Sequence, residues 1–276
     1  MERNYSPLRY PGGKGKLSAT VKSIIDANKV HDCTYIEPFA GGAGVALSLL
    51  FSQYVKRIVL NDINYQLFSF WNTLLLNPEY LIHKINDATL TIDEWTKQKH
   101  IFNNPHKYEQ KKIGFAFFYL NRTNRSGILN AGVIGGYAQS AKYKIDARFN
   151  KKNLIKRIEA IAEYKSKIEL YNMDTVDFLR SYEIKSSDRY FAYFDPPYYN
   201  KGQDLYTNFY THEDHKKLSD VVQNELSYNW IMTYDDTPAI RELYKNRSLT
   251  CFNLLYCAHN IRLGKELLIT CDNIYI

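Results

Sequence analysis

The stretch Tyr35-Ile36-Glu37-Pro38-Phe39-Ala40-Gly41-Gly42-Ala43-Gly44 decides the fold class of this chain. Its first part lies in residues 34–39, whose apolar and aromatic side chains predict a buried strand. The small residues that follow allow a tight turn, and residues 45–53 are then predicted to form a helix. A second predicted strand ends at Asn61-Asp62. Strand, helix and strand in this order indicate a βαβ unit, and hence an α/β protein.

The glycine-rich turn is also a candidate binding site. Small residues at such a turn let the backbone approach a nucleoside-type ligand closely. The full dinucleotide fingerprint is absent, because Leu47 stands where its last glycine would fall. Asp62 follows Gly44 by 18 positions, which is near the spacing of an acid that binds ribose hydroxyls. The alternative is a tightly packed turn followed by an ordinary loop aspartate.

A second candidate site is Asp195-Pro196-Pro197-Tyr198, which follows a predicted strand at residues 190–194. Two prolines cannot continue a sheet, so the chain turns there. The turn places a carboxylate, prolyl carbonyls and an aromatic ring at the carboxyl end of a strand, where open α/β sheets bind ligands. This set suits a planar molecule with an exocyclic amine, such as a nucleobase. The alternative is a plain surface turn.

The rest of the chain alternates in the same manner, except in its middle. Further strands are predicted at residues 168–171, 230–233, 248–255 and 266–270, and helices at 17–27, 68–84, 91–100 and 113–120. Thr211 is predicted to cap a helix that begins at His212. We therefore predict an α/β core made of residues 1–64 and 161–276, interrupted by a mostly helical insertion at residues 65–160.

Charge suggests what the insertion binds. The chain of 276 residues has a formal net charge of +7 and a pI of about 9.0, which favours a polyanionic partner. The insertion contains a polar loop, residues 121–127, and seven basic residues against one acid between Lys142 and Arg157. The candidate nucleic-acid contacts are Arg122, Asn124, Arg125, Lys142, Lys144, Arg148 and Lys151. The alternative is a solvated, charged helix.

Other classes of protein are disfavoured. The first residues form no apolar signal core, and apolar runs such as residues 45–51 are too short to span a membrane. The four cysteines show no CxxC spacing and no disulfide framework, which favours a reduced, cytoplasmic setting. His212 and His215 lack a nearby set of ligands to complete a metal site, so we expect no metal and place both at the surface or at a helix cap.

Six segments, in this order, resemble the motifs of the Dam-like (D12 class, α-group) DNA adenine-N6 methyltransferases. The segments are Ser6–Lys14, Tyr35–Val45, Asn61–Asn64, Asp195–Tyr198, Phe209–His215 and Thr233–Thr237. Two positions depart from the pattern, because Tyr10 replaces a tryptophan of the best-known members and Ala43 a common glycine. The loop 121–136 lacks the pattern of members that recognise GATC, so no recognition sequence is carried over.

The resemblance implies a Rossmann-like, seven-stranded mixed sheet as the methyltransferase core, with the insertion as target-recognition domain. It also implies S-adenosyl-L-methionine as cofactor and double-stranded DNA as partner, with methyl transfer to N6 of a flipped adenine. The implied catalytic residues are Asp195, Pro196, Pro197 and Tyr198. The implied cofactor-binding residues are Tyr10, Lys14, Glu37, Pro38, Phe39, Gly41, Asp62, Asp174 and Asp195. A cognate restriction endonuclease is a further expected partner, without a physical complex, in a bacterium or a virus-infected cell.

Two other hypotheses stay open at this point. A related enzyme could methylate N4 of cytosine, or an amino group in RNA, although aspartate before the two prolines favours adenine. A non-catalytic DNA-binding regulator could share the fold, but the presence of Lys14, Asp62 and Asp195 argues against it. The identity of the methylated nucleoside and the binding of the cofactor distinguish these hypotheses.

Overall fold

The structure is a computed structural model that describes residues 5–9, 15–200, 210–256 and 262–276. Its contacts divide the chain into two compact units. The first unit contains residues 12–64 and 167–276, and the second contains residues 5–11 and 65–166. The division between residues 64 and 65 falls two residues after Asp62, the acid that follows the second strand. The short N-terminal segment belongs by its contacts to the second unit.

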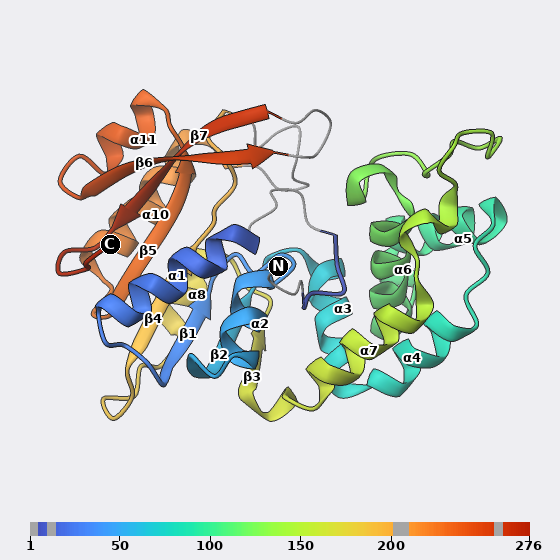
Figure 1. Cartoon of the computed structure of the whole chain (residues 1–276), viewed down its shortest axis with the longest axis horizontal. Helices are drawn as coiled ribbons and strands as arrows, with labels where there is room; N and C mark the ends of the chain where they lie inside the picture. The colour runs from blue at the N-terminus through green and yellow to red at the C-terminus, as the bar shows by residue number, and fades with distance from the viewer. Residues whose placement is uncertain (1–4, 10–14, 201–209, 257–261) are drawn as a thin grey trace. The chain divides into compact units, whose positions relative to one another are not determined.

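The described part of the first unit is built on a seven-stranded mixed sheet, with the strand order β3-β2-β1-β4-β5-β7-β6 (Figure 1). The strands are β1 (Cys33–Glu37), β2 (Val55–Asn61), β3 (Ile168–Tyr171), β4 (Tyr190–Phe194), β5 (Asn229–Asp235), β6 (Ser248–Tyr256) and β7 (Arg262–Thr270). The first five strands pair in parallel, and β7 runs antiparallel to both β5 and β6. This confirms the predicted Rossmann-like mixed sheet.

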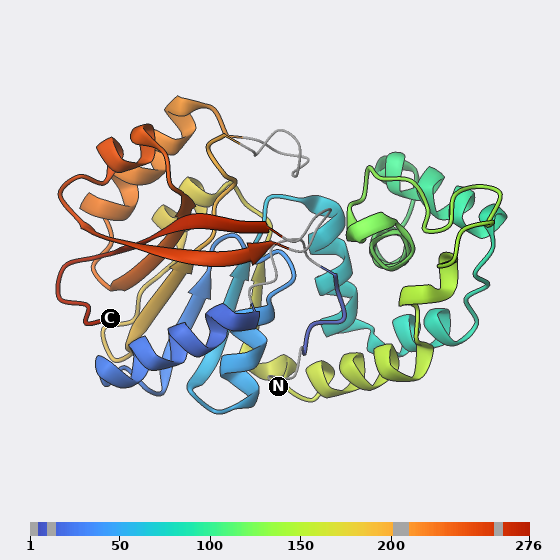
Figure 2. The same ribbon diagram turned by 45° about the horizontal axis from the view of Figure 1, so that its top comes forward.

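Helices cover the sheet on both faces. The helices that the structure describes in this unit are α1 (Gly15–Ala27), α2 (Gly44–Phe51), α8 (Thr175–Ser181), α10 (His212–Asn224) and α11 (Pro238–Leu243). Figure 2 shows α1 and α2 on one side of the strands and α10 and α11 on the other. The core under α8, α10 and α11 joins Phe178, Leu218, Val222 and Ile240 to strand residues such as Phe194. Full burial of one such side chain stabilises the fold by about 1.5–3 kcal/mol.

The carboxyl ends of the parallel strands meet at one edge of the sheet. Ile36 of β1 lies opposite Val59 of β2 on one side and Ala192 of β4 on the other. The strand order reverses between β1 and β4, because the chain runs outward from β1 through β2 to β3 and then returns to β4. Open α/β sheets bind their ligands at such a switch point. The glycine-rich turn and the Asp195 turn both leave the sheet there.

The second unit is mostly helical. Its helices are α3 (Tyr65–Leu76), α4 (Pro78–Asn86), α5 (Ile92–Asn103), α6 (Gln110–Thr123) and α7 (Lys151–Ala162), with short 3-10 turns at Pro105–Lys107, Arg125–Gly127 and Ile145–Arg148. Helix α6 is the most buried of these, and Phe118 stacks on Phe70 of α3 at 5.6 Å between ring centroids. Gly114 permits this approach, because a Cβ there would lie 2.5 Å from the Ser69 carbonyl oxygen. An aromatic core therefore joins α3 to α6.

Most elements lie where the sequence predicts them, with one break and three additions. The predicted helix at residues 68–84 is two helices, because Pro78 cannot donate to the preceding turn and instead begins α4. Helices α7, α8 and α11 were not predicted. Thr211 caps α10 as predicted, in a capping box with Asp214. Within the described residues, no helix has the length and apolar character needed to cross a membrane.

Candidate active site and nucleic-acid interface

The Asp195 turn leaves the carboxyl end of β4 with its carboxylate held by the neighbouring strand. Pro196 is buried and Asp195 is partly exposed. Thr233 of β5 donates from its hydroxyl to Oδ1 of Asp195 over 3.4 Å, and the same hydroxyl lies 2.8 Å from that of Tyr193. Burial, and next the charge of Asp195, raise the pKa of Tyr193 well above its ordinary value, so this phenol stays neutral. The Asp195 carboxylate therefore has a defined position at the sheet edge.

Asp235, the last residue of β5, holds the far end of the same turn. Its two carboxylate oxygens accept separate backbone N–H groups, from Tyr199 at 2.8 Å and from Asn200 at 3.1 Å. Only 8% of Asp235 is exposed. Hydrogen bonds that a carboxylate accepts from backbone N–H groups are stronger than those between neutral groups, and these two bind the turn after β4 to the end of β5.

Tyr198 lies inward from the turn. It is 4% exposed, and its hydroxyl donates to Oε1 of Glu266, a fully buried residue of β7. The predicted role of Tyr198 is to stack on a flipped base, and a stacking ring needs an accessible face. In this structure the ring is enclosed, so the stacking role stays a prediction.

A buried histidine packs beneath the turn. His215 of α10 is 0% exposed, and its Nδ1 lies 2.8 Å from the hydroxyl of Tyr234. The ring of Tyr199 lies over it at 5.1 Å between centroids. The prediction that both histidines lie at the surface or at a cap is therefore wrong for His215, although His212 is exposed. The reason is helical spacing, because α10 turns its residue 215 toward the sheet together with Leu218 and Val222.

Burial of His215 makes the stability of the fold depend on pH. Burial lowers the pKa of His215 to about 4, while the nearby Asp235 and Asp214 oppose this shift. Between the unfolded pKa and pH 4 the unfolded chain binds the extra proton, so stability falls as the pH falls. We expect wild type to lose about 2–3 kcal/mol of unfolding free energy between pH 7 and pH 4 relative to His215→Asn. Urea unfolding at a series of pH values measures it.

The matched control for this effect is His212→Asn, three residues earlier on the same helix. Its side chain is exposed and its replacement leaves His215 buried, so the stability of this variant should still fall between pH 7 and pH 4. All three proteins contain the same carboxylates, so the contribution of these groups to the pH dependence of stability cancels in the comparison. An identical slope for wild type and His215→Asn would contradict a buried, neutral histidine.

The ends of β1, β2 and β3 are joined by one buried amide. Asn61 is 0% exposed, and its Nδ2 donates to the Pro38 carbonyl oxygen at 3.1 Å and to that of Met173 at 3.2 Å. Its Oδ1 accepts the N–H of Met173 at 3.1 Å. Glu37, 4% exposed, accepts the N–H of Ala46 at 2.9 Å in the first turn of α2. Glu37 and Pro38 thus support the glycine-rich turn from within.

Asp62 lies beside the glycine-rich turn. One carboxylate oxygen accepts the N–H of Gly41 at 3.0 Å, and the other accepts that of Asn64 at 2.9 Å. Burial raises the pKa of Asp62, and these two N–H groups oppose the shift. Gly41 has a φ of 47°, a left-handed conformation that favours glycine. Phe39 packs edge-on against Tyr210, with 5.9 Å between ring centroids.

Asp174 begins α8 after the end of β3. Its Oδ1 accepts the N–H groups of Val176 at 2.9 Å and Asp177 at 3.4 Å, and the residue is exposed. The preceding Asn172 donates to the carbonyl oxygen of Asp62 at 2.7 Å. Asp62 and Asp174 therefore belong to one connected edge.

The predicted cofactor residues of the first unit that the structure describes thus lie along the carboxyl ends of the four strands β3, β2, β1 and β4. Glu37 ends β1, Phe39 and Asp62 follow β1 and β2, and Asp174 and Asp195 follow β3 and β4. Tyr10 and Lys14 lie outside the described residues. Within the described ranges, no group of three or more His, Cys, Asp or Glu side chains is arranged to hold a metal ion.

Two predicted nucleic-acid residues are less accessible than their sequence pattern indicates. Asn124 is fully buried, where it accepts from the Trp95 indole at 2.7 Å and donates to the Ile128 and Leu129 carbonyl oxygens. Lys151 donates to the Asn86 carbonyl oxygen at 2.7 Å. Asn124 therefore shapes the loop rather than presenting a free amide.

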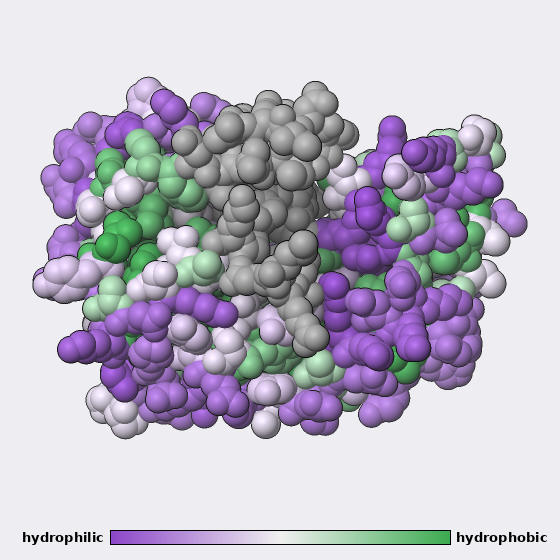
Figure 3. Space-filling model, viewed as in Figure 1, coloured by the Kyte–Doolittle hydropathy of each residue, from purple (hydrophilic) through white to green (hydrophobic). Residues whose placement is uncertain are grey.

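The other predicted contacts lie on the surface of the second unit. Arg125, Lys142, Lys144 and Arg148 are exposed, and Arg122 is partly exposed. Figure 3 shows hydrophilic side chains gathered over α4 and α7 of this unit. Exposed cations of this kind can neutralise backbone phosphates.

Sequence reasoning assigned no role to several residues that the structure places at these sites. Asn61 and Thr233 end predicted strands, and Asp235 lies two residues beyond the second of these. All three belong to segments that carry the resemblance, so their position was a usable signal. Glu266 carried no local signal, because its partner Tyr198 is 68 positions away along the chain.

The fold and this edge define a Rossmann-like α/β protein, with an acid after β2 and a carboxylate-proline turn at the switch point. Residues 10–260 match the model of the family described as D12 class N6 adenine-specific DNA methyltransferase. The chain belongs to this family, which confirms the resemblance.

Known relatives cover most of the chain. Type II methyltransferase M.MjaIII of Methanocaldococcus jannaschii is 26% identical over 204 residues, which are 69% of this chain and 68% of the relative. Type II methyltransferase M.CviBI of Paramecium bursaria Chlorella virus NC1A is 25% identical over 94% of this chain and 95% of its own. The DNA adenine methylase of Vibrio cholerae is 24% identical over 90% of this chain and 88% of its own.

Proposed function

We propose that the chain transfers a methyl group from S-adenosyl-L-methionine to N6 of a flipped adenine in double-stranded DNA. The observation that carries the proposal is the Asp195 turn, which follows β4 at the switch point, between the ends of β1 and β5. The family supports the base and the atom, since its description specifies N6 of adenine in DNA.

The turn suits the chemistry of an exocyclic amine. The N6 lone pair of adenine is delocalised into the ring, which makes this nitrogen a poor nucleophile. Asp195 accepts one N6 hydrogen and the Pro196 carbonyl oxygen accepts the other, which favours a tetrahedral nitrogen and stabilises its developing positive charge. Pro197 restricts the backbone that positions these acceptors.

The residues at the switch point fit the methyl donor. Its sulfonium supplies an electrophilic methyl group when it is bound. Asp62 would accept hydrogen bonds from the ribose hydroxyls, and its carboxylate is already oriented by Gly41 and Asn64. Asp174 is exposed and would lie beside the adenine of the cofactor. Phe39 offers an aromatic surface, and Tyr10 and Lys14 complete the predicted set.

One experiment tests the function. The purified protein is incubated with unmethylated duplex DNA and S-adenosylmethionine, and the DNA is then hydrolysed to nucleosides. We expect N6-methyladenine, and the same base at one short sequence when the gene is expressed in a methylation-free host. N4-methylcytosine, or methylation of RNA alone, would replace the proposal by the related amino-methyltransferase. Absence of both methylation and cofactor binding would leave a DNA-binding regulator.

The proposal extends to partners and setting. Two relatives are named type II methyltransferases, so we propose that the modification protects DNA from a restriction endonuclease of the same specificity. No complex between the two enzymes is needed, because they meet at the DNA sequence. The place of action is the cytoplasm of a bacterium or of a virus-infected cell.

A further inference from the structure

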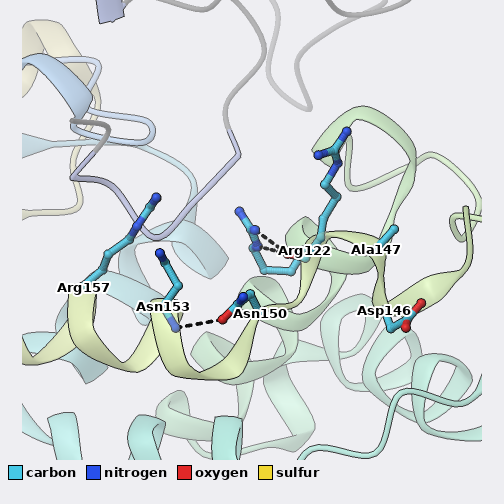
Figure 4. A pocket seen from close by; sticks show the side chains of 7 residues that line it. Arg122, Asp146, Ala147, Asn150, Asn153 and Arg157 are labelled. Carbon is cyan, nitrogen blue, oxygen red and sulfur yellow. Dashed lines mark hydrogen bonds between the residues drawn. The ribbon is translucent and has the colours of Figure 1, made fainter. Parts of the chain in front are cut away.

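The second unit contains a pocket lined by arginine side chains. It has a volume of about 450 Å³, and its lining includes Arg122, Arg148 and Arg157 together with Asn150 and Asn153. Figure 4 shows Arg122, Asn153 and Arg157 pointing toward the same open side. The lining comes from the end of α6, the 3-10 turn before α7, and the first half of α7.

A fourth arginine belongs to the same charge cluster. The side chain of Asn121 makes two hydrogen bonds to the backbone of Arg9. Its Oδ1 accepts the Arg9 N–H at 2.7 Å, and its Nδ2 donates to the Arg9 carbonyl oxygen at 2.8 Å. The Arg9 guanidinium donates to the Asn124 carbonyl oxygen at 2.9 Å. The neighbouring Ser6 carbonyl oxygen accepts from Arg157 at 2.6 Å. The N-terminal segment is thereby held against α6 and α7.

The neutral contacts of this cluster orient the cations without balancing their charge. Nε of Arg122 donates to the Arg148 carbonyl oxygen at 2.7 Å. Asp146 is the acid in the lining, and it is exposed. Across the described parts of the chain, no ion pair joins Arg9, Arg122, Arg148 or Arg157 to a carboxylate. Buried or partly buried charges are ordinarily paired.

Repulsion among these arginines favours the binding of an anion. Burial, and then the charges of Arg9, Arg157 and Arg148, lower the pKa of Arg122 to about 9. Burial, and then Arg148, also lower the pKa of Arg9. An anion in the pocket would reverse the repulsion and restore these groups to their usual range.

The start of α7 adds a second attraction for an anion. Asn150 caps the helix by accepting the N–H of Asn153 at 3.0 Å, as Figure 4 shows. The N-terminus of a 12-residue helix carries a partial positive charge and donor N–H groups. Both asparagines also offer amide groups to an oxyanion.

We propose that this pocket binds a phosphodiester of the DNA backbone, with Arg157 as a contact beyond the predicted Arg122 and Arg148 and with Arg9 adding positive charge beside them. The assignment rests on the proposed function, because DNA supplies the phosphate. Guanidinium forks match the paired oxygens of a phosphate, and the volume admits a phosphate with part of its sugar. The described lining contains no aromatic ring on which a base would stack.

The test compares two double variants of equal charge change. Arg122→Gln/Arg157→Gln removes two cations from the pocket, and Lys152→Gln/Lys156→Gln removes two exposed cations of α7. In a salt series with duplex DNA, the pocket variant should bind at least about tenfold more weakly, and its slope should be about one unit shallower. The control should stay within about threefold of wild type. An equal loss of DNA affinity in both variants would overturn the proposal, because affinity would then depend on the net charge of the surface and not on the pocket.

A neutral-phosphate scan identifies the ligand. Duplexes with a single methylphosphonate are bound by both proteins, and one position should weaken wild type while leaving the pocket variant unaffected. If no position behaves so, the DNA assignment fails. Inorganic phosphate that raises the Tm of wild type and not of the variant would then assign the pocket to a free anion.

Two controls keep the outcome clear. If the double variant unfolds, Arg148→Gln replaces it, because that side chain is exposed and its loss leaves the fold intact. DNA binding is measured independently of methyl transfer. If the wild-type protein binds DNA but does not methylate it, the proposed function is refuted and the phosphate site is not. Wild type that methylates while the pocket variant binds normally would refute only the phosphate site.

Discussion

Asp195→Asn should lower the rate of methyl transfer by about 10²- to 10³-fold, the size of effect found when one preorganised polar group is removed from a charged transition state. Asparagine keeps the shape of the side chain but replaces one carboxylate oxygen by an NH₂ donor, which opposes the hydrogens of N6. It also removes the negative charge that stabilises the nitrogen as it becomes positive. Single-turnover kinetics at saturating DNA and cofactor measure the step directly.

The controls for Asp195→Asn are the stability of the variant and the activity of a second variant, Asp195→Ala. The Thr233 hydroxyl can still donate to the amide oxygen of the variant, so thermal unfolding should resemble that of wild type. Asp195→Ala should lose at least as much activity, since it removes both oxygens of the carboxylate. Methyl transfer near the wild-type rate in a folded Asp195→Ala protein would refute the assignment of this turn to catalysis.

The sheet was predictable from sequence because its strands are short apolar runs with turns at known places. Residues 168–171 and 190–194 were predicted with the bounds that the structure has. Helix α7 was predicted only as a basic stretch. Its apolar residues Leu154, Ile158 and Ile161, which are buried at helical spacing, would have predicted the helix. Charge and amphipathic order are separate signals, and both are present in α7.

The candidate site was predictable only as far as local motifs reach. Asp62 and Asp195 follow strands, and strand ends of a parallel sheet meet at one edge, so their proximity needed no long-range information. Arg9 and Arg157 lie 148 positions apart in the chain and show no shared pattern. Their association depends on Asn121 and Ser6, whose contacts arise only in the folded second unit. The sequence therefore indicated Arg122 and Arg148 one by one, but not the pocket that brings them together with Arg157.

Asp235→Asn should lower the rate of methyl transfer by about 10²-fold, because displacing a reacting group by about 1 Å costs that much. The carboxylate of Asp235 accepts the N–H groups of Tyr199 and Asn200, and an amide can accept only one of them. Its NH₂ group would face the other N–H, so the turn that carries Asp195 would shift. Asp235 itself does not need to touch the base, which makes it a positioning residue.

Two measurements separate a positioning role from simple destabilisation of the fold: the affinity for S-adenosylmethionine and the single-turnover rate of methyl transfer. Asp235→Asn should bind S-adenosylmethionine with nearly wild-type affinity, since Asp62 and Asp174 follow other strands, while its single-turnover rate falls. The matched control is Asp236→Asn at the next position, where the carboxylate pairs with Arg241 at 2.6 Å and does not contact the turn. That variant should keep the wild-type rate even if its Tm drops slightly. Equal rates for the two variants would show that the hydrogen bonds from Tyr199 and Asn200 to Asp235 do not govern methyl transfer.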